Sequence, residues 1–242
     1  MSSNSFTKGL KKDIKLFDKL HNRYLKYIDA YKPIYFKHLE SELTALHDKF
    51  PNVDFIMHAR IKSFDGYTEK FERKLKEGKT GNVYDLYAKK YIIISVDSCT
   101  VEEVLTDMCY EFEKFLLDFN SKNFADLPAK RKDYIEEPKA NNYQAIHVTF
   151  QSKTHKDLFE ETQIKTSRMH LCADCGEANH RVYKSRAEFN LKKVPVYFTS
   201  TDFKNKYGNY IVRELTSEEC MNYYYGEKKD DATMASSYER EL

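Results

Sequence analysis

The chain has 242 residues, of which 41% are hydrophobic and 32% are charged. This composition excludes a disordered or fibrous protein and predicts one large domain, or one domain with extensions, around a buried core. Five cysteines without framework spacing favour a reducing compartment, and neither a secretory leader nor an apolar run long enough to span a membrane is visible. We therefore expect a cytoplasmic protein that has no membrane partner.

The net charge of +2 conceals an asymmetry between the two ends of the chain. Residues 1–39 hold nine Lys and Arg against three Asp, whereas residues 217–242 hold seven Asp and Glu against three Lys and Arg. A basic segment can bind polyanions such as RNA. A solvated helical face explains the same pattern, and the charge by itself favours that interpretation.

The first half of the chain predicts helices around a buried strand. Apolar residues at helical spacing predict a helix from about residue 11 to 49, which Pro33 is expected to break or restart. The other elements expected here are a helix at about residues 60–76, a loop at 78–81, a buried strand at 91–96 and an amphipathic helix at 101–119.

The second half predicts strands that pair with one another. Residues 145–150 and 159–166 are expected to form two strands joined by a short turn, after a polar and irregular segment at 120–140. The other elements expected here are a helix at 169–184, strands at 196–198 and 210–212, a turn at 208–209 and a frayed tail after residue 226.

The irregular alternation of strands and helices predicts an α+β protein in which helices pack around a mixed β-sheet. We divide the chain into a basic helical region at residues 1–54, a core at 55–190 and a C-terminal part at 191–242. The C-terminal part is expected to hold a strand pair and an acidic tail packed on the same domain.

Cations recur along the second expected helix, at Arg60, Lys62, Lys70, Arg73 and Lys74. Arginine and lysine form charge-assisted bonds with phosphate, so such a face can hold a triphosphate. A solvent-exposed helix face accounts equally well for these residues when they are taken alone.

Two carboxylates are placed to meet beside phosphates. Asp85 directly precedes the apolar strand, and Glu161 lies on another expected strand, where the two-residue period puts it on one face with Gln163 and Lys165. Carboxylates that converge from neighbouring strands are a common way to hold Mg²⁺. A charged face on a central strand indicates that the strand lines a site.

The segment from Lys139 to His147 is a polar loop that runs into an apolar strand. It carries a cation at Lys139, an amide at Asn141 and an aromatic ring at Tyr143, and this combination favours base stacking and phosphate contacts. A structural role remains the default for any one of 19 tyrosines and for His147.

Other site classes are disfavoured. Cys172 and Cys175 form one CxxC pair near His170 and His180, but the expected helix and the unusual histidine spacing argue against zinc. The sequence contains no phosphate-binding P-loop and no GxGxxG motif, which excludes those two nucleotide-binding folds.

Six segments in order closely resemble the synthetase domain of RelA/SpoT nucleotide pyrophosphokinases over about residues 55–185. The family implies a nucleotidyltransferase-like fold and, without a hydrolase domain, a small alarmone synthetase. The segments are Arg60 to Ser63, Asp85 to Lys90, Lys132 to Ile135, Pro138 to His147, Glu161 to Thr166 and Met169 to Lys184.

The resemblance implies transfer of the β,γ-diphosphate of ATP to a ribose 3′-hydroxyl, with release of AMP. Glu161 would activate that hydroxyl and share Mg²⁺ with Asp85, and Gln163 would support the site. ATP would be held by Arg60 at the adenine, by Lys62, Ser63 and Lys70 at the phosphates, and by Arg73. The acceptor would be held by Tyr143, stacked on its base, and by Lys139, Asn141 and His147.

Four positions depart from the family pattern. Ala88 and Lys90 replace a usual glycine and arginine, Gly66 replaces a frequent serine, and Asn142 replaces the usual glycine of the acceptor loop. Asparagine tolerates left-handed backbone better than most residues, so we expect the loop conformation to persist.

The sequence leaves the acceptor open between two molecules. We lean towards the 3′-CCA adenosine of tRNA, because the N-terminal region is basic and Lys130, Arg131 and Lys132 lie near the acceptor loop. The protein would then be a translation-inhibiting toxin with an antitoxin partner. The alternative is a (p)ppGpp synthetase of the stringent response that uses GTP or GDP, and a catalytically dead RNA-binding relative is a third hypothesis.

Overall fold

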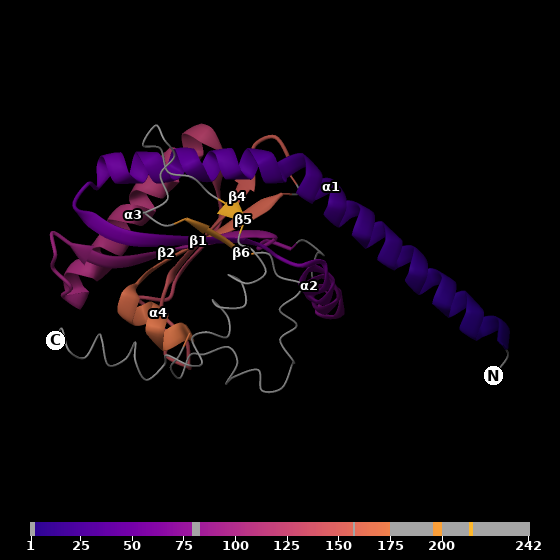
Figure 1. The fold of residues 1–242 in the computed structure, drawn as a ribbon. Helices are drawn as coiled ribbons and strands as arrows, with labels where there is room; N and C mark the ends of the chain where they lie inside the picture. The colour runs from indigo at the N-terminus through magenta and orange to yellow at the C-terminus, as the bar shows by residue number, and fades with distance from the viewer. Residues whose placement is uncertain (1–2, 79–82, 157, 175–195, 200–212, 215–242) are drawn as a thin grey trace.

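The computed structural model describes residues 3–78, 83–156, 158–174, 196–199 and 213–214. Within these ranges a mixed seven-stranded sheet runs in the order β3-β4-β5-β2-β1-β6-β7, and Figure 1 shows α1 and α3 on one side of it and α4 on the other. The α+β class with a mixed sheet is therefore confirmed. The elements are α1 (Ser3–Lys49), β1 (Val53–Ile61), α2 (Phe64–Lys76), β2 (Tyr87–Val96), α3 (Glu102–Asn123), β3 (Ala125–Asp133), β4 (Ile146–Ser152), β5 (Phe159–Thr166), α4 (Ser167–Asp174), β6 (Val196–Thr199) and β7 (Arg213–Glu214).

The central strands β2 and β5 run parallel, whereas the other neighbouring strands pair antiparallel. Their register sets Ala88 opposite Glu161 and Lys90 opposite Gln163. Since side chains alternate along a strand, these four residues share one face of the sheet. The face opposite to them is the one that builds the core.

The core lies between this second face of the sheet and the helices α1 and α3. Strand β1 alternates buried and accessible residues along its length, as expected when one face is covered. Large aromatic side chains dominate the packing, and edge-to-face contacts such as Tyr31 with Tyr87 and Phe55 with Phe112 fix their orientation. The fully buried aromatic residues include Tyr31, Tyr35, Phe55, Tyr87, Tyr91, Phe112 and Phe150.

Helix α1 continues through Pro33, so the predicted break is wrong. Proline removes one backbone donor and can bend a helix without ending it, and Figure 1 shows α1 bend between its projecting half and the half on the sheet. Tyr31, Tyr35 and Leu39 are each at most 1% exposed on either side of the proline. Burial of these side chains outweighs the local cost, of the order of 3 kcal/mol, of an internal proline.

Two boundaries differ from the sequence prediction. The helix expected from Arg60 begins at Phe64, because Arg60 belongs to β1 and Lys62 to the connection that follows. The segment expected to be irregular contains the end of α3 and strand β3. Strand β3 lies at the sheet edge, where lysines and prolines are common, and its register shifts on both sides of Pro128.

Most of the other predicted helices and strands are confirmed where the structure describes them. The strand at 91–96, the helix at 101–119 and the strand pair at 145–150 and 159–166 are confirmed as parts of β2, α3, β4 and β5, and β6 confirms the strand at 196–198. The second part of the helix at 169–184, the strand at 210–212, its turn and the acidic tail lie outside the described residues. No helix within the described ranges is long and apolar enough to cross a membrane.

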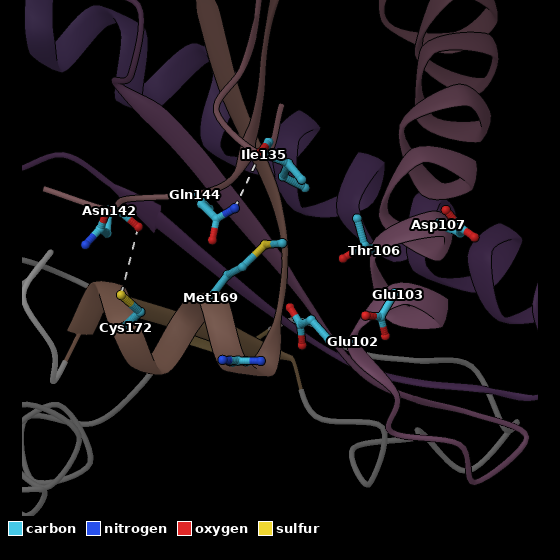
Figure 2. A pocket seen from close by; sticks show the side chains of 10 residues that line it. Glu102, Glu103, Thr106, Asp107, Ile135, Asn142, Gln144, Met169 and Cys172 are labelled. Atoms are coloured by element: carbon cyan, nitrogen blue, oxygen red, sulfur yellow. Dashed lines mark hydrogen bonds between the residues drawn. The ribbon is translucent and has the colours of Figure 1, made fainter. Parts of the chain in front are cut away.

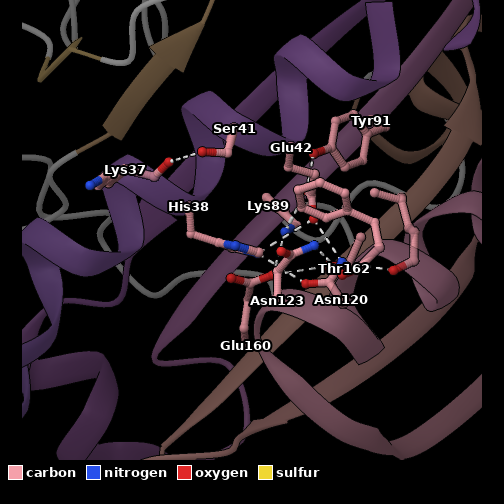
Figure 3. Close-up of polar contacts among 12 residues, drawn as sticks. Lys37, His38, Ser41, Glu42, Lys89, Tyr91, Asn120, Asn123, Glu160 and Thr162 are labelled. Atoms are coloured by element: carbon pink, nitrogen blue, oxygen red, sulfur yellow. Dashed lines mark hydrogen bonds and ion pairs between the residues drawn. The ribbon is translucent and has the colours of Figure 1, made fainter. Parts of the chain in front are cut away.

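A buried polar cluster connects α1 and α3 to the central strands (Figure 3). Lys89 Nζ of β2 lies 2.6 Å from Glu42 Oε1 of α1 and 2.5 Å from Glu160 Oε1 of β5. Asn120 of α3 and Tyr91 of β2 both donate hydrogen bonds to the Glu42 carboxylate. Burial opposes the charge of Lys89, but the two carboxylates outweigh it and raise the pKa of Lys89.

Candidate active site

Three cations surround the carboxylate of Asp85, which lies just before β2. Lys62 Nζ is 3.0 Å and Arg60 Nη2 is 3.9 Å from Asp85 Oδ2, and Lys70 Nζ is 2.7 Å from Asp85 Oδ1. These cations come from β1, from the β1–α2 connection and from α2. The sequence predicted these three cations on one helix. The structure also brings them together, but from a strand, a connection and a helix.

Ser63 and Arg73 occupy different parts of the same helix. The hydroxyl of Ser63 caps α2 by accepting a hydrogen bond of 3.3 Å from the backbone N–H of Gly66. Ser63 therefore lies at the positive end of the helix dipole, which favours anions. Arg73 lies in the last turn of α2, and its Nε is 4.0 Å from Glu77 Oε1, so its place at the phosphate site stays a prediction.

Asp85 is held in its ionised form. Burial by itself would raise its pKa, but the charges of Lys62 and Lys70 outweigh burial and hold the pKa below the ordinary aspartate value. The charge of Glu161 acts in the opposite direction and raises the pKa of Asp85. Glu161 on β5 is therefore close enough for the two carboxylates to repel each other.

Glu161 is ionised as well, and hydrogen-bond donors stabilise its charge. Gln163 Nε2 donates to Glu161 Oε2 at 3.0 Å, and His147 Nδ1 is 3.6 Å from Glu161 Oε1. Burial opposes the charge, but His147, Gln163 and Lys70 together lower the pKa of Glu161 to about 2. Glu161 and Gln163 share one strand face, as the two-residue period predicts.

His147 supports Glu161 as a neutral ring. Burial, followed by the charges of Lys165 and Lys139, lowers the pKa of His147 despite the attraction of Glu161. The Nδ1 side of the ring lies towards Glu161, and Nε2 and the hydroxyl of Tyr143 form a hydrogen bond of 2.8 Å. His147 therefore approaches the Glu161 carboxylate through Nδ1, and it is foremost among the groups that lower the pKa of Glu161.

Tyr143 joins the acceptor loop to this network. Its hydroxyl is 3.2 Å from Gln163 Oε1 and accepts a hydrogen bond of 3.4 Å from Lys165 Nζ. The ammonium of Lys139 lies between two phenol rings, 4.4 Å from the centroid of Tyr143 and 4.3 Å from that of Tyr134. Cations and aromatic rings thus meet beside Glu161.

The acceptor loop is a tight turn that needs left-handed backbone. Asn142 N–H donates to the carbonyl of Lys139 at 2.8 Å, and Asn142 has a φ of 59°. The expectation that asparagine can stand in for glycine here is confirmed, since its side chain tolerates this conformation. Asn141 lies inside the turn, so its contact with an acceptor stays a prediction.

A hollow of about 600 Å³ opens beside the acceptor loop (Figure 2). Asn142 and Gln144 form its loop side, the first turns of α3 form a second wall, and Arg168, Met169 and Cys172 of α4 form a third. The sulfur of Cys172 is 3.9 Å from the carbonyl oxygen of Asn142, which places α4 against the loop. The lining residues from α3 are Glu102, Glu103, Thr106 and Asp107.

Two residues of this site, Lys165 and Tyr134, have no role predicted from the sequence. Lys165 lies on the same face of β5 as Glu161 and Gln163, so the two-residue period of the strand could have identified it as a site residue. Tyr134 follows Lys132 by two residues, and its ring is 5.2 Å from that of His147, centroid to centroid. Cys172 lies on α4, but Cys175 and His180 are outside the described residues, so the expected lack of a zinc site is untested.

The chain is similar to several curated proteins. It is 31% identical over 136 residues to a probable guanosine-3′,5′-bis(diphosphate) 3′-pyrophosphohydrolase of Mycoplasma pneumoniae, which covers 56% of this chain and 16% of that protein. It is also 31% identical over 132 residues to a probable chloroplastic GTP diphosphokinase of Arabidopsis thaliana, covering 48% and 18%. The chain therefore spans less than a fifth of the length of these relatives.

Solved structures give weaker matches. Small alarmone synthetase 2 from Bacillus subtilis matches with a TM-score of 0.47 and 16% identity, over 92% of this chain and 98% of that chain. Small alarmone synthetase 1 from the same organism, bound to its product pppGpp, matches with a TM-score of 0.45 and 20% identity, over 70% and 86%.

The family model described as "Region found in RelA / SpoT proteins" matches residues 59–188. This range is more than half of the chain, and it contains every residue of the Asp85 and Glu161 sites. The chain belongs to the RelA/SpoT family.

Proposed function

We propose that this protein is an ATP-dependent pyrophosphokinase. The observation that carries the proposal is the convergence of two ionised carboxylates, Asp85 and Glu161, with the cations Lys62 and Lys70 and with the hydroxyl of Tyr143. Such a site suits phosphoryl chemistry, which depends on positioning and charge neutralisation more than on a covalent nucleophile.

In the proposed reaction, the 3′-oxygen of the acceptor ribose attacks the β-phosphorus of ATP. A new bond forms between that oxygen and the β-phosphorus, the bond from the β-phosphorus to the bridging α,β-oxygen breaks, and AMP leaves. The hydroxyl proton moves to Glu161 or passes from it to solvent. A carboxylate with a pKa of about 2 is a weak base. Because the transition state of such a transfer is loose, the acceptor hydroxyl does not need to be deprotonated early, and the main role of Glu161 is to orient it.

Magnesium fits the residues of this site. Mg²⁺ prefers hard oxygen ligands and is usually bound by one or two carboxylates together with substrate phosphates. Asp85 and Glu161 are both ionised at neutral pH, and the charge of Glu161 raises the pKa of Asp85. Two neighbouring carboxylates are the donor set that the ion needs. When bound, the ion would neutralise charge on the diphosphate, and Lys62 and Lys70 would turn from Asp85 towards the phosphates.

The donor and the acceptor would approach from two sides of Glu161. On the donor side, Arg60 would contact the adenine and Lys62, Ser63 and Lys70 the phosphates, with Arg73 at the outer end. On the acceptor side, Tyr143 would stack on the base, which is worth about 1–3 kcal/mol per base in comparable sites. Lys139, Asn141 and His147 complete the set of acceptor residues, and Gln163 supports Glu161 between the two sides.

For the acceptor we propose the 3′-terminal adenosine of tRNA, with an antitoxin protein as partner. The support is the exposed basic residues Lys130 and Lys132 on edge strand β3, which pairs with the strand that carries His147. Arg131 contributes less, because Glu113 and Asp133 engage its guanidinium. The second candidate is GTP or GDP, which the names of the curated relatives favour.

The deciding experiment offers γ-³²P-ATP and Mg²⁺ to the purified protein with deacylated tRNA, GTP or GDP in parallel. Label on the tRNA 3′ end supports the first acceptor, and label in a guanosine tetra- or pentaphosphate supports the second. If no acceptor is labelled and no AMP forms, the pyrophosphokinase proposal fails, and the catalytically dead RNA-binding relative takes its place.

A further inference from the structure

The connection between β1 and α2 carries the donor-side residues Lys62 and Ser63, and it is only two residues long. The backbone N–H and the backbone carbonyl of Lys62 both form hydrogen bonds. Its N–H donates to the carbonyl of Leu86 at 2.7 Å, next to Asp85, and its carbonyl accepts a hydrogen bond of 2.9 Å from the hydroxyl of Tyr24 on α1. Helix α1 therefore reaches directly into the segment that would hold the phosphates of ATP.

The Lys62 carbonyl depends on Tyr24 because α2 does not use it. The first backbone bond of α2 runs from Tyr67 N–H to the carbonyl of Ser63, at 2.9 Å, which leaves the preceding carbonyl outside the helix. A backbone carbonyl in a partly buried segment needs a donor, and here a side chain 38 positions earlier supplies it. The position of Lys62 is thus tied to tertiary packing and not only to local structure.

Aromatic packing fixes the place of the Tyr24 ring. Its centroid is 5.4 Å from that of Phe64, the first residue of α2, and 5.6 Å from that of the buried Tyr67. Phe17 and His21 of α1 contact the same Phe64 ring from 5.2 Å and 4.9 Å. The rings bring α1 onto the start of α2, and the hydroxyl of Tyr24 then sets the backbone of Lys62.

We propose that Tyr24 is a positioning residue for the donor site, through which α1 holds the phosphate-binding Lys62 at its distance from Asp85. This inference rests on the proposed function, because it takes Lys62 to contact the phosphates of ATP. Tyr24 itself acts through Lys62 and does not touch the substrate. The consequence is that ATP binding depends on the contact between Tyr24 of α1 and the connection that carries Lys62.

The test compares Tyr24→Phe with Tyr27→Phe. Both variants remove one phenol hydroxyl from α1 and keep the ring, but the hydroxyl of Tyr27 accepts a hydrogen bond from Arg23 of the same helix at 3.1 Å. For each protein we would measure the Kd of a non-hydrolysable ATP analogue by calorimetry, the KM for ATP and for the acceptor, and the midpoint of thermal unfolding.

Loss of one intramolecular hydrogen bond should weaken binding of the ATP analogue by Tyr24→Phe by about three- to tenfold. The KM for the acceptor should stay at the wild-type value, and Tyr27→Phe should bind the analogue as the wild type does. A purely structural role predicts equal behaviour of the two variants. The inference is overturned if Tyr24→Phe binds the analogue within twofold of wild type, or if ATP and acceptor are affected alike.

The outcome also separates this inference from the proposed function. If the wild-type protein does not bind the ATP analogue at all, the donor site itself is wrong, and the role of Tyr24 falls with it. If the wild type binds the analogue and Tyr24→Phe binds it equally well, the donor site stands and only the positioning role is lost.

Discussion

Ionised carboxylates dominate the candidate site at the scale of single residues. Asp85 lies just before β2, and Glu161 lies on the neighbouring parallel strand β5. Different neighbours stabilise their charges: Lys62 and Lys70 for Asp85, and mainly His147 and Gln163 for Glu161. Each pKa is lowered although burial opposes ionisation. A pair of carboxylates that stays charged in a semi-buried site is a strong indication of a ligand cation or of phosphate chemistry.

Replacing Glu161 with glutamine should abolish the proposed activity. The substitution keeps the side-chain volume and removes the charge, so we expect AMP release to fall by at least about 100-fold. The measurement is AMP formed per minute at saturating ATP and acceptor. Glu136→Gln changes an exposed carboxylate between β3 and β4 and should behave as wild type. Wild-type turnover by Glu161→Gln would remove this carboxylate from the mechanism.

The same carboxylate should make the fold sensitive to acid. The pKa of Glu161 is about 2 in the folded state against an ordinary value of 4.5, so its stabilising contribution is fully present above about pH 4.5 and is lost as the pH falls towards 2. We expect the free energy of unfolding, measured in urea, to decline across this window in the wild type. The decline should be shallower in Glu161→Gln, and identical slopes would contradict the lowered pKa.

Tyr143 should matter for the acceptor and not for ATP. Its ring and its hydroxyl have separate roles, because the ring lies against Lys139 while the hydroxyl contacts His147 and Gln163. We expect Tyr143→Ala to raise the KM for the acceptor by about 10- to 100-fold through lost stacking, with the Kd of an ATP analogue unchanged. Tyr143→Phe keeps the ring and should retain acceptor affinity. Equal losses for ATP and acceptor in Tyr143→Ala would reject the stacking role.

At the scale of elements, the parallel pairing of β2 and β5 builds the site on one face and the buried polar cluster on the other. Lys89 lies next to Ala88 and Lys90 in β2, and Glu160 lies next to Glu161 in β5. The ion pairs of Lys89 with Glu160 and Glu42 therefore join α1 to β5, which carries Glu161, and to β2, which begins two residues after Asp85. Both partners are completely buried, so removal of one leaves uncompensated charge.

Replacing Lys89 with methionine should destabilise the protein strongly. Two carboxylates would remain buried without a cation, and we expect a loss of about 3–5 kcal/mol in the free energy of unfolding. The measurement is urea unfolding, with Lys114→Met on the exposed face of α3 as the control. Adding Glu160→Gln should recover part of the loss, since it removes one of the two unpaired charges. A loss no larger than that of the control would contradict the account.

The edge strand β3 is an element that the local sequence does not predict. Its lysines and Pro128 indicate an irregular segment when they are read locally, yet the same residues suit a strand that has only one neighbour. Strands β2, β4 and β5 were predictable, because each carries the β-branched or aromatic residues that favour strands.

At the scale of the whole molecule, α1 is both a part of the core and a projection beyond it. Figure 1 shows its first half extending past the sheet, while Tyr35, Leu39 and Leu46 of its second half are completely buried. The projecting half belongs to the basic segment of the sequence. A long basic helix that leaves the body of a domain suits a polyanion larger than a nucleotide.

Charge reversal at Lys11, Lys12 and Lys15 tests this suggestion. If α1 docks tRNA, the triple change to glutamate should lower kcat/KM for tRNA by at least about tenfold at low salt, and the effect should shrink as salt screens the charges. Release of AMP with GTP or GDP should not change. Reversal of Lys114 and Lys122 on α3 is the matched control. An unchanged kcat/KM for tRNA would assign the basic segment to structure alone.

The sequence by itself determined the chemical parts of this protein. Motif order identified the family, periodicity in β5 put Glu161 and Gln163 on one face, and the tolerance of asparagine for left-handed backbone predicted the turn at Asn142. These features depend on neighbours in the chain, so local patterns suffice to reveal them.

Only the tertiary structure decided how those parts meet. Arg60 and Lys62 reach Asp85 from a strand and its connection, although they were expected on a helix, and α1 continues through Pro33 because its aromatic residues are buried against the sheet. The contacts of Lys89 with Glu42 and of Tyr24 with the Lys62 carbonyl join residues distant in the chain. No local pattern encodes such contacts, because their free energy comes from burial and pairing that exist only once the elements have packed.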